Sequence, residues 1–418
     1  MERTTCLVVG GGPAGMVLGL LLARGGVEVT VLEKHGDFLR DFRGDTVHAS
    51  TLTLLDELGL GPAFAQVPHQ DVDKIEALLD GGAKATIADL SRLPGPNKRI
   101  AMVPQWDFLD LLADAGRAEP SFTLRMNTEV TEITKSGNRV TGVKYRDRVD
   151  GHEGEFAADL VVAADGRSSI LRAAVQLPVY SFGAPMDVWW FRLPRKETDD
   201  VKGGAGRFSS GSGLVLIPRG EYFQCAFLIR KGTDQAVRAE GVEKFRERVV
   251  TLVPWLADRV GHLEDLDEVK LLDVKLDRLR QWHVDGLLCI GDAAHAMSPV
   301  GGVGINLAVQ DAVAAATLLA KPLREGRVTP AVLAKVRGRR LFPTVLIQTV
   351  QRVIHRLFLG RKLNSTETVS STGMPLPLKL AQKLPFLQAV PAYVVAIGPR
   401  PEHAPDFARR DPQTVVRS

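Results

Sequence analysis

The sequence predicts an α/β protein in which a βαβ-type domain is interrupted by a mostly antiparallel β-sheet and followed by a helical C-terminal region. Three observations support this prediction. A short apolar strand near the N-terminus runs through the glycine turn VVGGGPAG into a helix. Two later apolar segments, DLVVAADG and LLCIGDAA, also end in glycine turns. Between them, strand-like segments follow one another over most of residues 178–280, which is typical of an inserted antiparallel sheet.

The composition is that of a globular protein with a large core. The chain has 418 residues, of which 45% are hydrophobic and 24% charged, enough for two or three structural units. The net charge of +4 is too small to favour nucleic-acid binding. Cys6, Cys225 and Cys289 lie in separate apolar runs without metal-ligand spacing. We therefore expect buried free thiols, a reducing cytoplasmic location and no metal site.

The apolar segment Leu7–Ala23 is similar in composition to a signal peptide or a membrane span. The glycines and Pro13 at its centre argue against one continuous helix, and the following VEVTVLE has the pattern of a partner strand. We interpret the segment as strand, turn and helix, and we expect no transmembrane segment.

The other elements follow from hydrophobic periodicity and turn signals. Apolar or alternating runs predict strands, and apolar residues three or four apart predict helices. In the N-terminal part these patterns predict strands at Thr5–Val9 and Val27–Leu32, helices at Pro13–Arg24, Ala49–Leu60 and Pro104–Arg117, and a hairpin at Val130–Arg146. Later they predict strands in VWWFRLP, GLVLIP and YFQCAFLIRKG, a helix near Val242–Leu256, and a basic, amphipathic helix at Leu341–Leu363.

The first chemical motif is a G-x-G-x-x-G turn formed by Gly10, Gly12 and Gly15. The first glycine permits the tight turn, the second lets the backbone approach a pyrophosphate, and the third brings helix and strand together. The N-terminus of the helix offers free N–H groups to the phosphates. Glu33, at the end of the second strand, is placed to bond ribose hydroxyls. The motif predicts a Rossmann-like site for an adenine dinucleotide and does not separate NAD from FAD.

Two later turns extend this site. In ADGRSSILR, Asp165 and Gly166 follow a buried strand directly, although an ordinary strand-ending turn would explain these residues equally well. In LLCIGDAAH, Asp292 follows another buried strand, where its carboxylate can bond a ribityl or ribose hydroxyl.

The order of the motifs resembles that of the class A flavoprotein monooxygenases, the para-hydroxybenzoate hydroxylase-like family. G-x-G-x-x-G with a distant glutamate is followed by D-G-x-x-S-x-x-R, and then by G-D-A-A-H with P-x-G-G-x-G-x-N. The resemblance extends over roughly residues 1–320. It implies a discontinuous, Rossmann-like FAD-binding domain (1–70, 101–177 and 281–340), an inserted substrate domain (71–100 and 178–280) and a C-terminal helical region (341–418).

The resemblance also implies the residues that bind FAD. On the adenosine and pyrophosphate side they are Gly10, Gly12, Pro13, Ala14, Gly15, Glu33, Lys34 and Val130. Arg43 is similar to an arginine near the pyrophosphate and flavin, Gln105 to a glutamine at the ribityl or phosphate region, and Asp292 to the aspartate bonded to the ribityl chain. Asp165 and Gly166 resemble a pair implicated in both FAD and NAD(P)H binding. Beside the flavin ring the implied residues are Pro299, Gly302, Val303, Gly304, Ile305 and Asn306. Many family members have a polar residue at the position of Val303, but a backbone contact survives this change.

By this resemblance the protein is an FAD-dependent monooxygenase with NADPH or NADH as a transient co-substrate. It would use O2 to hydroxylate or epoxidise an aromatic or polyketide-like small molecule through a flavin C4a-hydroperoxide. A helix that begins near Gly304 would direct its N-terminal N–H groups at the negative charge of the reduced flavin. The cofactor carries the oxygen chemistry, so no Ser-His-Asp set, cysteine nucleophile or metal is required. We expect a monomer or a homodimer.

Few side chains are candidates for catalysis. For His295 and His48 we favour structural hydrogen bonding over acid–base work, which leaves Arg43 and Tyr222. Alternation along the strand places Tyr222, Gln224 and Ala226 on one face and Phe223, Cys225 and Phe227 on the other, without showing which face meets the substrate. Trp189, Trp190 and Phe191 are expected in the core or on a sheet face, with one of them a candidate to line the pocket.

Three other functions are compatible with parts of the sequence. An FAD-dependent reductase or dehydrogenase of the geranylgeranyl-reductase-like type would share the first and third motifs, whereas the full Asp-Gly motif favours a monooxygenase. A flavin halogenase is disfavoured because no W-x-W-x-I-P segment occurs. A non-catalytic, flavin-holding protein or membrane-attached partner has only the basic helix Leu341–Leu363 in its favour, and such helices more often pack on a core.

Overall fold

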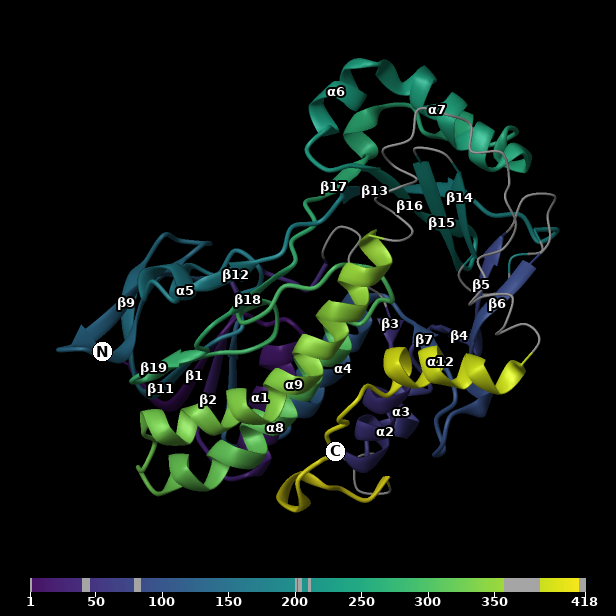
Figure 1. The fold of residues 1–418 in the computed structure, drawn as a ribbon. Coiled ribbons are helices and arrows are strands. Elements are labelled where there is room, and N and C mark those ends of the chain that lie inside the picture. Colours follow the sequence, from purple (N-terminus) through teal and green to yellow (C-terminus); the bar gives the residue numbers. More distant parts are fainter. Residues whose placement is uncertain are drawn as a thin grey trace.

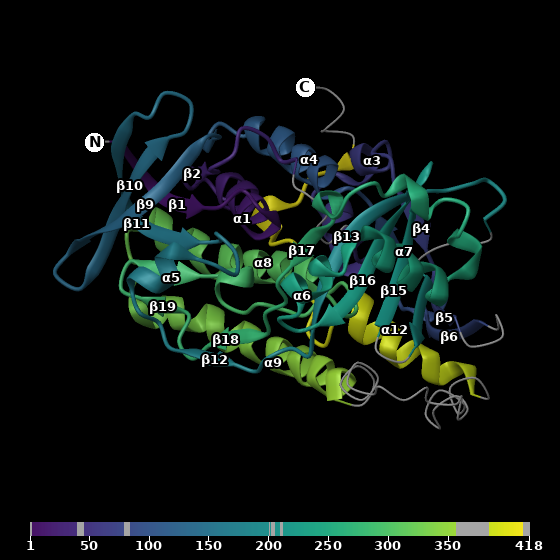
Figure 2. The same ribbon diagram turned by 90° about the horizontal axis from the view of Figure 1, so that it is seen from above.

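The computed structural model describes residues 2–39, 46–78, 84–199, 201, 205–209, 212–356 and 384–412. Two large sheets with helices around them organise this part of the chain, so the predicted α/β class is confirmed. The hairpin β9–β10 lies at one end of the molecule and strands β5 and β6 at the other (Figures 1 and 2). No helix in the described ranges is both long and apolar enough to cross a membrane.

The first sheet is largely parallel. Among the described residues it has eight strands, six of them in the order β19-β20-β11-β1-β2-β8, while β10 pairs with β11 and β9 with β10. The bounds are β1 (Glu2–Val9), β2 (Val29–Leu32), β8 (Phe122–Arg125), β9 (Thr128–Ser136), β10 (Arg139–Asp147), β11 (Glu153–Ala163), β19 (His283–Val284) and β20 (Leu287–Cys289). The carboxyl-terminal halves of β1 and β11 are apolar and buried, as expected of parallel strands covered on both faces.

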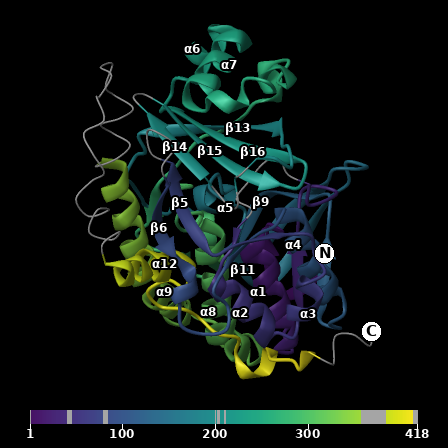
Figure 3. The ribbon, with the colours of Figure 1, turned by 90° about the vertical axis from the view of Figure 1, so that its right-hand side faces the viewer.

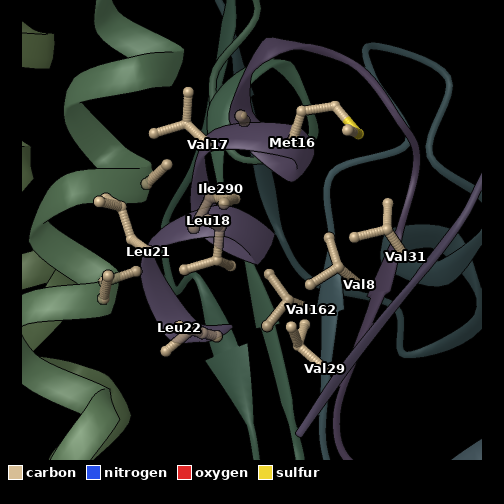
Figure 4. Close-up of a cluster of buried hydrophobic side chains, with 14 of the residues drawn as sticks. Val8, Met16, Val17, Leu18, Leu21, Leu22, Val29, Val31, Val162 and Ile290 are labelled. Carbon is tan, nitrogen blue, oxygen red and sulfur yellow. The ribbon is translucent and has the colours of Figure 1, made fainter. Parts of the chain in front are cut away.

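Helices complete this layer. Residues Ala14–Ala23 of α1 (Pro13–Arg24) are all buried, as expected of a helix that is apolar all round. Its side chains meet those of the central strands, including Val8, Val162 and Ile290 (Figure 4). Helix α8 (Gly304–Arg324) lies against α1, and α9 (Pro330–Ile354) lies against α8 (Figure 1). The other helices near this sheet are α2 (Ala49–Glu57), α3 (Gly61–Phe64), α4 (Gln105–Arg117) and α5 (Ile170–Ala174).

The second sheet is the predicted inserted sheet, and it is mostly antiparallel. Its strands in the described ranges have the order β17-β13-β16-β15-β14-β5-β6. The bounds are β5 (Lys74–Leu78), β6 (Lys84–Asp89), β13 (Met186–Pro194), β14 (Ala205–Ser209), β15 (Ser212–Arg219), β16 (Tyr222–Arg230) and β17 (Lys270–Leu272). Helices α6 (Asp234–Ala239) and α7 (Gly241–Leu252) lie on the side of this sheet away from the first one (Figure 3).

Smaller elements fill the space between the two sheets. A three-stranded sheet has the order β3-β7-β4, and β12 pairs with β18. Helix α12 packs beside β6 near the C-terminus (Figure 2). The bounds are β3 (Thr46–Val47), β4 (Gln70–Val72), β7 (Ile100–Met102), β12 (Val179–Ser181), β18 (Asp277–Leu279) and α12 (Ala389–Ala396).

Most predicted elements are found close to their expected bounds. Helix α1 coincides with the prediction, but α2 stops at Glu57 and α7 at Leu252, each about one turn early. A 3-10 turn follows α7 because Pro254 cannot continue the helical hydrogen-bond ladder. Patterning missed α6, a helix too short to develop clear periodicity. All three cysteines are buried and free, as predicted.

Candidate functional site

The first glycine turn is held by close backbone contacts. Gly10 has φ +107°, and a Cβ there would lie 2.5 Å from the carbonyl oxygen of Ala164. A Cβ on Gly15 would lie 1.9 Å from the carbonyl oxygen of Gly10. Gly12 differs, because no heavy atom lies within 4 Å of its would-be Cβ, and no side chain caps α1 there. The N-terminus of α1 is therefore open to an anionic ligand.

Glu33 is tied to the same turn. Its Oε2 accepts a hydrogen bond from the Gly11 amide at 2.9 Å, and its Oε1 accepts one from the His35 amide at 3.1 Å. The buried carboxylate thus ties the end of β2 to the first glycine turn. The Thr128 amide donates to the Glu33 carbonyl at 2.8 Å. This bond brings the start of β9, with its buried Val130, to the same corner, whereas the neighbouring Lys34 is exposed.

The second and third turns lie beside the first, since β1, β11 and β20 are neighbours in the sheet. Arg167 Nη2 lies 3.7 Å from Asp292 Oδ2, and the Arg172 side chain donates to the Ala293 carbonyl at 3.4 Å. Both contacts join the Asp-Gly motif to the late Gly-Asp motif. A Cβ on Gly291 would lie 3.2 Å from the Ala14 side chain. The three predicted turns therefore converge at the carboxyl ends of parallel strands.

Asp165 has an unusual environment. Its Oδ2 accepts a hydrogen bond from the Ile170 amide at 3.0 Å, while its buried Oδ1 has no partner within the described part of the chain. Burial raises the pKa of this carboxyl above its ordinary value. The neighbouring Gly166 has φ +84° and open space around it. A buried acceptor beside an open backbone turn fits a ligand that carries hydroxyl donors.

The loop before α8 is held by the segment that begins at β3. The Gly302 carbonyl accepts a hydrogen bond from Thr46 Oγ1 at 3.0 Å and lies 3.0 Å from His48 Nε2. His48 Nδ1 lies 2.8 Å from the Val395 carbonyl of α12. Burial lowers the pKa of His48 to about 4, so the ring is neutral at physiological pH and has one N–H for two carbonyls. This confirms the structural hydrogen bonding predicted for His48.

The start of α8 is fixed in the same way. Ser50 and Thr51 donate to Asn306 Oδ1 at 2.8 and 2.9 Å, and Val303 is buried. Gly302 has φ +63°, a backbone conformation that favours glycine. Gly304 is the first residue of α8 and has no positive φ, so its backbone conformation does not require glycine. Pro299 and Ile305 are half-buried. Sequence reasoning missed Thr46, Ser50 and Thr51, whose role depends on a contact more than 250 residues distant.

Of the remaining predicted FAD contacts, Gln105 lies on a neighbouring segment. Gln105 is the first residue of α4 and follows β7, which pairs with β3 next to Thr46. It therefore lies on a segment adjoining the one that holds Gly302. Arg43 lies outside the described residues.

His295 belongs to a buried ionic network. Its Nε2 lies 2.5 Å from Asp311 Oδ2, which also accepts a hydrogen bond from the Gly291 amide at 3.1 Å. Arg340 Nε donates to Asp311 Oδ1 at 3.1 Å and its Nη1 lies 3.3 Å from Glu402. Burial alone would raise the pKa of Asp311, but His295 and Arg340 outweigh it and lower the pKa. The structural role predicted for His295 is confirmed, since its ring holds the third turn.

The two faces of the inserted sheet have different partners. Phe223, Cys225 and Phe227 belong to the core cluster that includes Phe245 of α7. Ala226 on the opposite face belongs to a cluster that Val300, in the loop before α8, packs against. The face of Tyr222, Gln224 and Ala226 therefore points to the loop before α8, whereas the other face packs on α7. The guanidinium carbon of Arg192 lies 4.9 Å from the centroid of the Tyr222 ring.

Comparison with known proteins agrees with this geometry. The family described as "FAD binding domain" matches residues 3–348. The 6-methylpretetramide 4-monooxygenase of Streptomyces rimosus is 34% identical over 394 residues, which are 93% of this chain and 91% of that protein. The protoasukamycin 4-monooxygenase of Streptomyces nodosus subsp. asukaensis is 27% identical, with 78% and 81% of the two chains covered.

Solved structures share the fold. The OxyS anhydrotetracycline hydroxylase of Streptomyces rimosus superposes with a TM-score of 0.73 at 20% identity, covering 94% of this chain and 76% of that chain. At this identity the similarity is one of fold.

Proposed function

This chain belongs to the FAD-binding-domain family of flavoprotein monooxygenases, and from that premise we propose that it hydroxylates a polycyclic aromatic, polyketide-like molecule. It is an FAD-dependent monooxygenase, with NAD(P)H as reductant and O2 as the second co-substrate. These comparisons favour this activity over that of a reductase of the geranylgeranyl-reductase-like type. The single observation that supports the proposal most strongly is the convergence of the three glycine turns on one edge of the parallel sheet.

We propose that the predicted residues divide among the parts of FAD as follows. We propose that the open N-terminus of α1 at Gly12 receives the pyrophosphate, with Pro13, Ala14 and Gly15 behind it. Glu33 would bond the ribose next to adenine, with Lys34 and Val130 beside it. Asp292, with Arg43 and Gln105, would hold the ribityl and phosphate part. The unpartnered Asp165 Oδ1 beside Gly166 would accept a hydroxyl proton from FAD or from NAD(P)H.

The loop Pro299–Asn306 is suited to lie along the flavin ring. Bound FAD supplies the activation of O2 and the transfer of oxygen. The chain contributes amide N–H groups at the start of α8, near Gly304, which would stabilise negative charge beside Val303 and Ile305. Thr46 and His48 hold the Gly302 carbonyl in one orientation, so the loop is preorganised. Tyr222, on the sheet face that points to this loop, is proposed to contact the substrate.

The substrate class that we propose rests on one relative in particular. That protein is named for the 4-monooxygenation of 6-methylpretetramide, and its similarity extends over nearly the whole of both chains. The sheet face that points to the loop before α8 is largely apolar and includes Ala226 and Leu228. An apolar face of this kind suits a large, flat, aromatic molecule.

Further features of the protein complete the proposal. We propose the division into an FAD-binding domain, an inserted substrate domain and a C-terminal region as predicted, with the boundary at residue 340 falling inside α9. We propose a cytoplasmic protein that is a monomer or a homodimer, and either NADH or NADPH as the physiological reductant.

Oxygen-electrode assays of the FAD-loaded protein test the function. Phenols, hydroxylated anthraquinones and tetracyclic phenols are added in turn with NADH or NADPH. We expect O2 uptake to rise with a polycyclic phenol, and the product to gain one oxygen atom from 18O2 by mass spectrometry. Reduction of an added substrate without O2 uptake would instead support a reductase.

A further inference from the structure

Two adjacent tryptophans on β13 have different hydrogen-bond partners. Trp189 is fully buried, and its indole N–H donates to Asp234 Oδ1 of α6 at 2.7 Å. Trp190 is 8% exposed, and within the described part of the chain its buried Nε1 has no acceptor. Buried N–H groups in native proteins nearly always have a partner. The unpartnered N–H of Trp190 is therefore available to a bound molecule, provided that the indole lies next to a binding site.

Trp190 lies on the face of the inserted sheet that points to the loop before α8. It is directly opposite Ala226 of β16, which in turn is opposite Val215 of β15. Val300, just before the glycines of the loop, packs against the same cluster. The cluster consists of Met186, Val188, Trp190, Ala226, Leu228 and Val274. The indole is thus part of the wall between the inserted sheet and the loop proposed to line the flavin ring.

The surroundings restrict the chemistry of the missing partner. An indole N–H can only donate a hydrogen bond. A hydroxyl group placed against it would bring a proton of its own, for which the apolar cluster members Val188, Ala226 and Leu228 provide no acceptor. A ketone or quinone oxygen accepts a hydrogen bond and has no proton to place. A carbonyl oxygen therefore fits this position better than a phenol.

The polar end of the face lies farther along the sheet. Arg219 Nε donates to Gln224 Oε1 at 3.1 Å, and both side chains are buried. Gln224 is two residues from Ala226 on β16 and shares its face. An aromatic molecule lying along the strand would therefore contact the apolar region that contains the Trp190 N–H, and then the Arg219–Gln224 pair.

We propose that Trp190 determines substrate specificity by donating its indole N–H to a carbonyl oxygen of the substrate, so that the enzyme selects aryl ketones or quinones. This inference rests on the proposed function, because it names the class of molecule that occupies the same site.

Two matched probes test the proposal by equilibrium dialysis against the FAD-loaded protein. 5-Hydroxy-1-tetralone has an aryl ketone, and 5,6,7,8-tetrahydro-1-naphthol is the same bicyclic phenol without it. The wild type is expected to bind the ketone roughly 3- to 10-fold more tightly, the contribution of one hydrogen bond. Trp190→Phe should abolish this preference and keep the affinity for the tetrahydronaphthol within about twofold. Trp190→Leu, a second variant without a hydrogen-bond donor, should do the same.

Two tryptophans serve as controls. Trp282 also has a buried indole N–H without a partner among the described residues, but it packs on His295 with ring centroids 5.0 Å apart, in the core of the first sheet. Trp189 lies on the other face of the same strand. Trp282→Phe and Trp189→Phe should retain the preference for the ketone.

The outcomes separate this proposal from the proposed function. Equal binding of both probes by the wild type, absence of binding included, would overturn the role of Trp190. Retention of the preference in Trp190→Phe with full FAD content would overturn it too. Neither result affects the O2 uptake and 18O incorporation that define the function. The two proposals can also fail in the opposite way. If only substitution of Trp190 abolishes the ketone preference but the wild type consumes no O2, the role of Trp190 is supported and the proposed monooxygenase activity is rejected.

Discussion

Arg167 Nη2 lies 3.7 Å from Asp292 Oδ2, so two motifs separated by more than 120 residues meet in one ion pair. The two side chains are 23% and 33% exposed, which leaves the carboxylate accessible to a ligand. The pair is therefore better suited to position Asp292 than to stabilise the fold, because half-exposed ion pairs contribute little to stability.

Replacement of Asp292 tests this role. Asp292→Ala removes the proposed acceptor for a ribityl hydroxyl and should weaken FAD binding about tenfold or more, as expected for a hydrogen bond to a charged group. The measurement is FAD bound per chain, by absorbance after gel filtration. Asp285→Ala is the matched control, since it breaks a similarly exposed pair with Arg139 on the same sheet. Full flavin content in Asp292→Ala would contradict the placement of this residue.

Two glycines of the first turn should respond differently to alanine. Gly12→Ala adds a methyl group where no protein atom lies within 4 Å, at a backbone conformation that alanine accepts. The FAD-free variant should keep the wild-type Tm but bind FAD at least about tenfold more weakly, because the methyl group occupies space needed by a phosphate. Gly10→Ala should lower the Tm itself, since its Cβ would clash with the Ala164 carbonyl at φ +107°.

Differential scanning fluorimetry and flavin-fluorescence titration separate the two effects. Wild-type FAD affinity in Gly12→Ala would show that the pyrophosphate does not pass over this residue.

His48 should make stability depend on pH. Its pKa is lowered by burial from 6.5 to about 4, so the unfolded chain takes up a proton in a range where the folded chain does not. Stability should therefore fall by about 3 kcal/mol as the pH decreases from 6.5 towards 4, and not decrease further through this residue below that value. Urea denaturation of the FAD-free protein at several pH values, with His48→Gln for comparison, measures the effect.

The variant should show a flatter pH dependence than the wild type over this range. His152→Gln changes an exposed histidine and should reproduce the wild-type profile. An unchanged slope in His48→Gln would mean that the ring is protonated in the folded protein.

Loss of the Asp311–Arg340 pair should strongly destabilise the protein. Both side chains are almost completely buried, and Asp311→Ala leaves the Arg340 charge with only Glu402, a carboxylate that Arg339 also uses, so the change should cost about 3–5 kcal/mol in unfolding free energy. The double variant Asp311→Leu/Arg340→Met should recover most of this loss, since it removes both charges. Asp114→Ala, which breaks the exposed pair with Arg117, should cost no more than about 1 kcal/mol. A loss in Asp311→Ala as small as this would show that water reaches the network.

Much of the cofactor site could be predicted from the sequence because it is built from local turns. Gly10, Gly12 and Gly15 have their roles within a few residues of one another, and a strand before and a helix after them complete the motif. Asp165 and Asp292 also follow apolar strands directly. Parallel strands bring their carboxyl ends to one edge, so the convergence of these turns follows from the fold class.

The long-range contacts could not be predicted in this way. Thr46 and His48 contact Gly302, and Arg340 contacts Asp311 and Glu402. Hydrophobic periodicity describes single helices and strands, so it gives no information on these contacts between distant segments. The boundary expected at residue 340 illustrates the difficulty, because α9 continues through it and carries Arg340 into the core of the first layer.

The sequence by itself determined the class of fold, the three turns and the resemblance to a flavoprotein family, because each of these is written in short segments. Only the tertiary structure decided which face of the inserted sheet points to the loop before α8. Alternation defines two faces of a strand but does not distinguish them, and the choice is made by what packs on each: α7 on the side of Phe223, and the loop with Val300 on the side of Trp190 and Ala226.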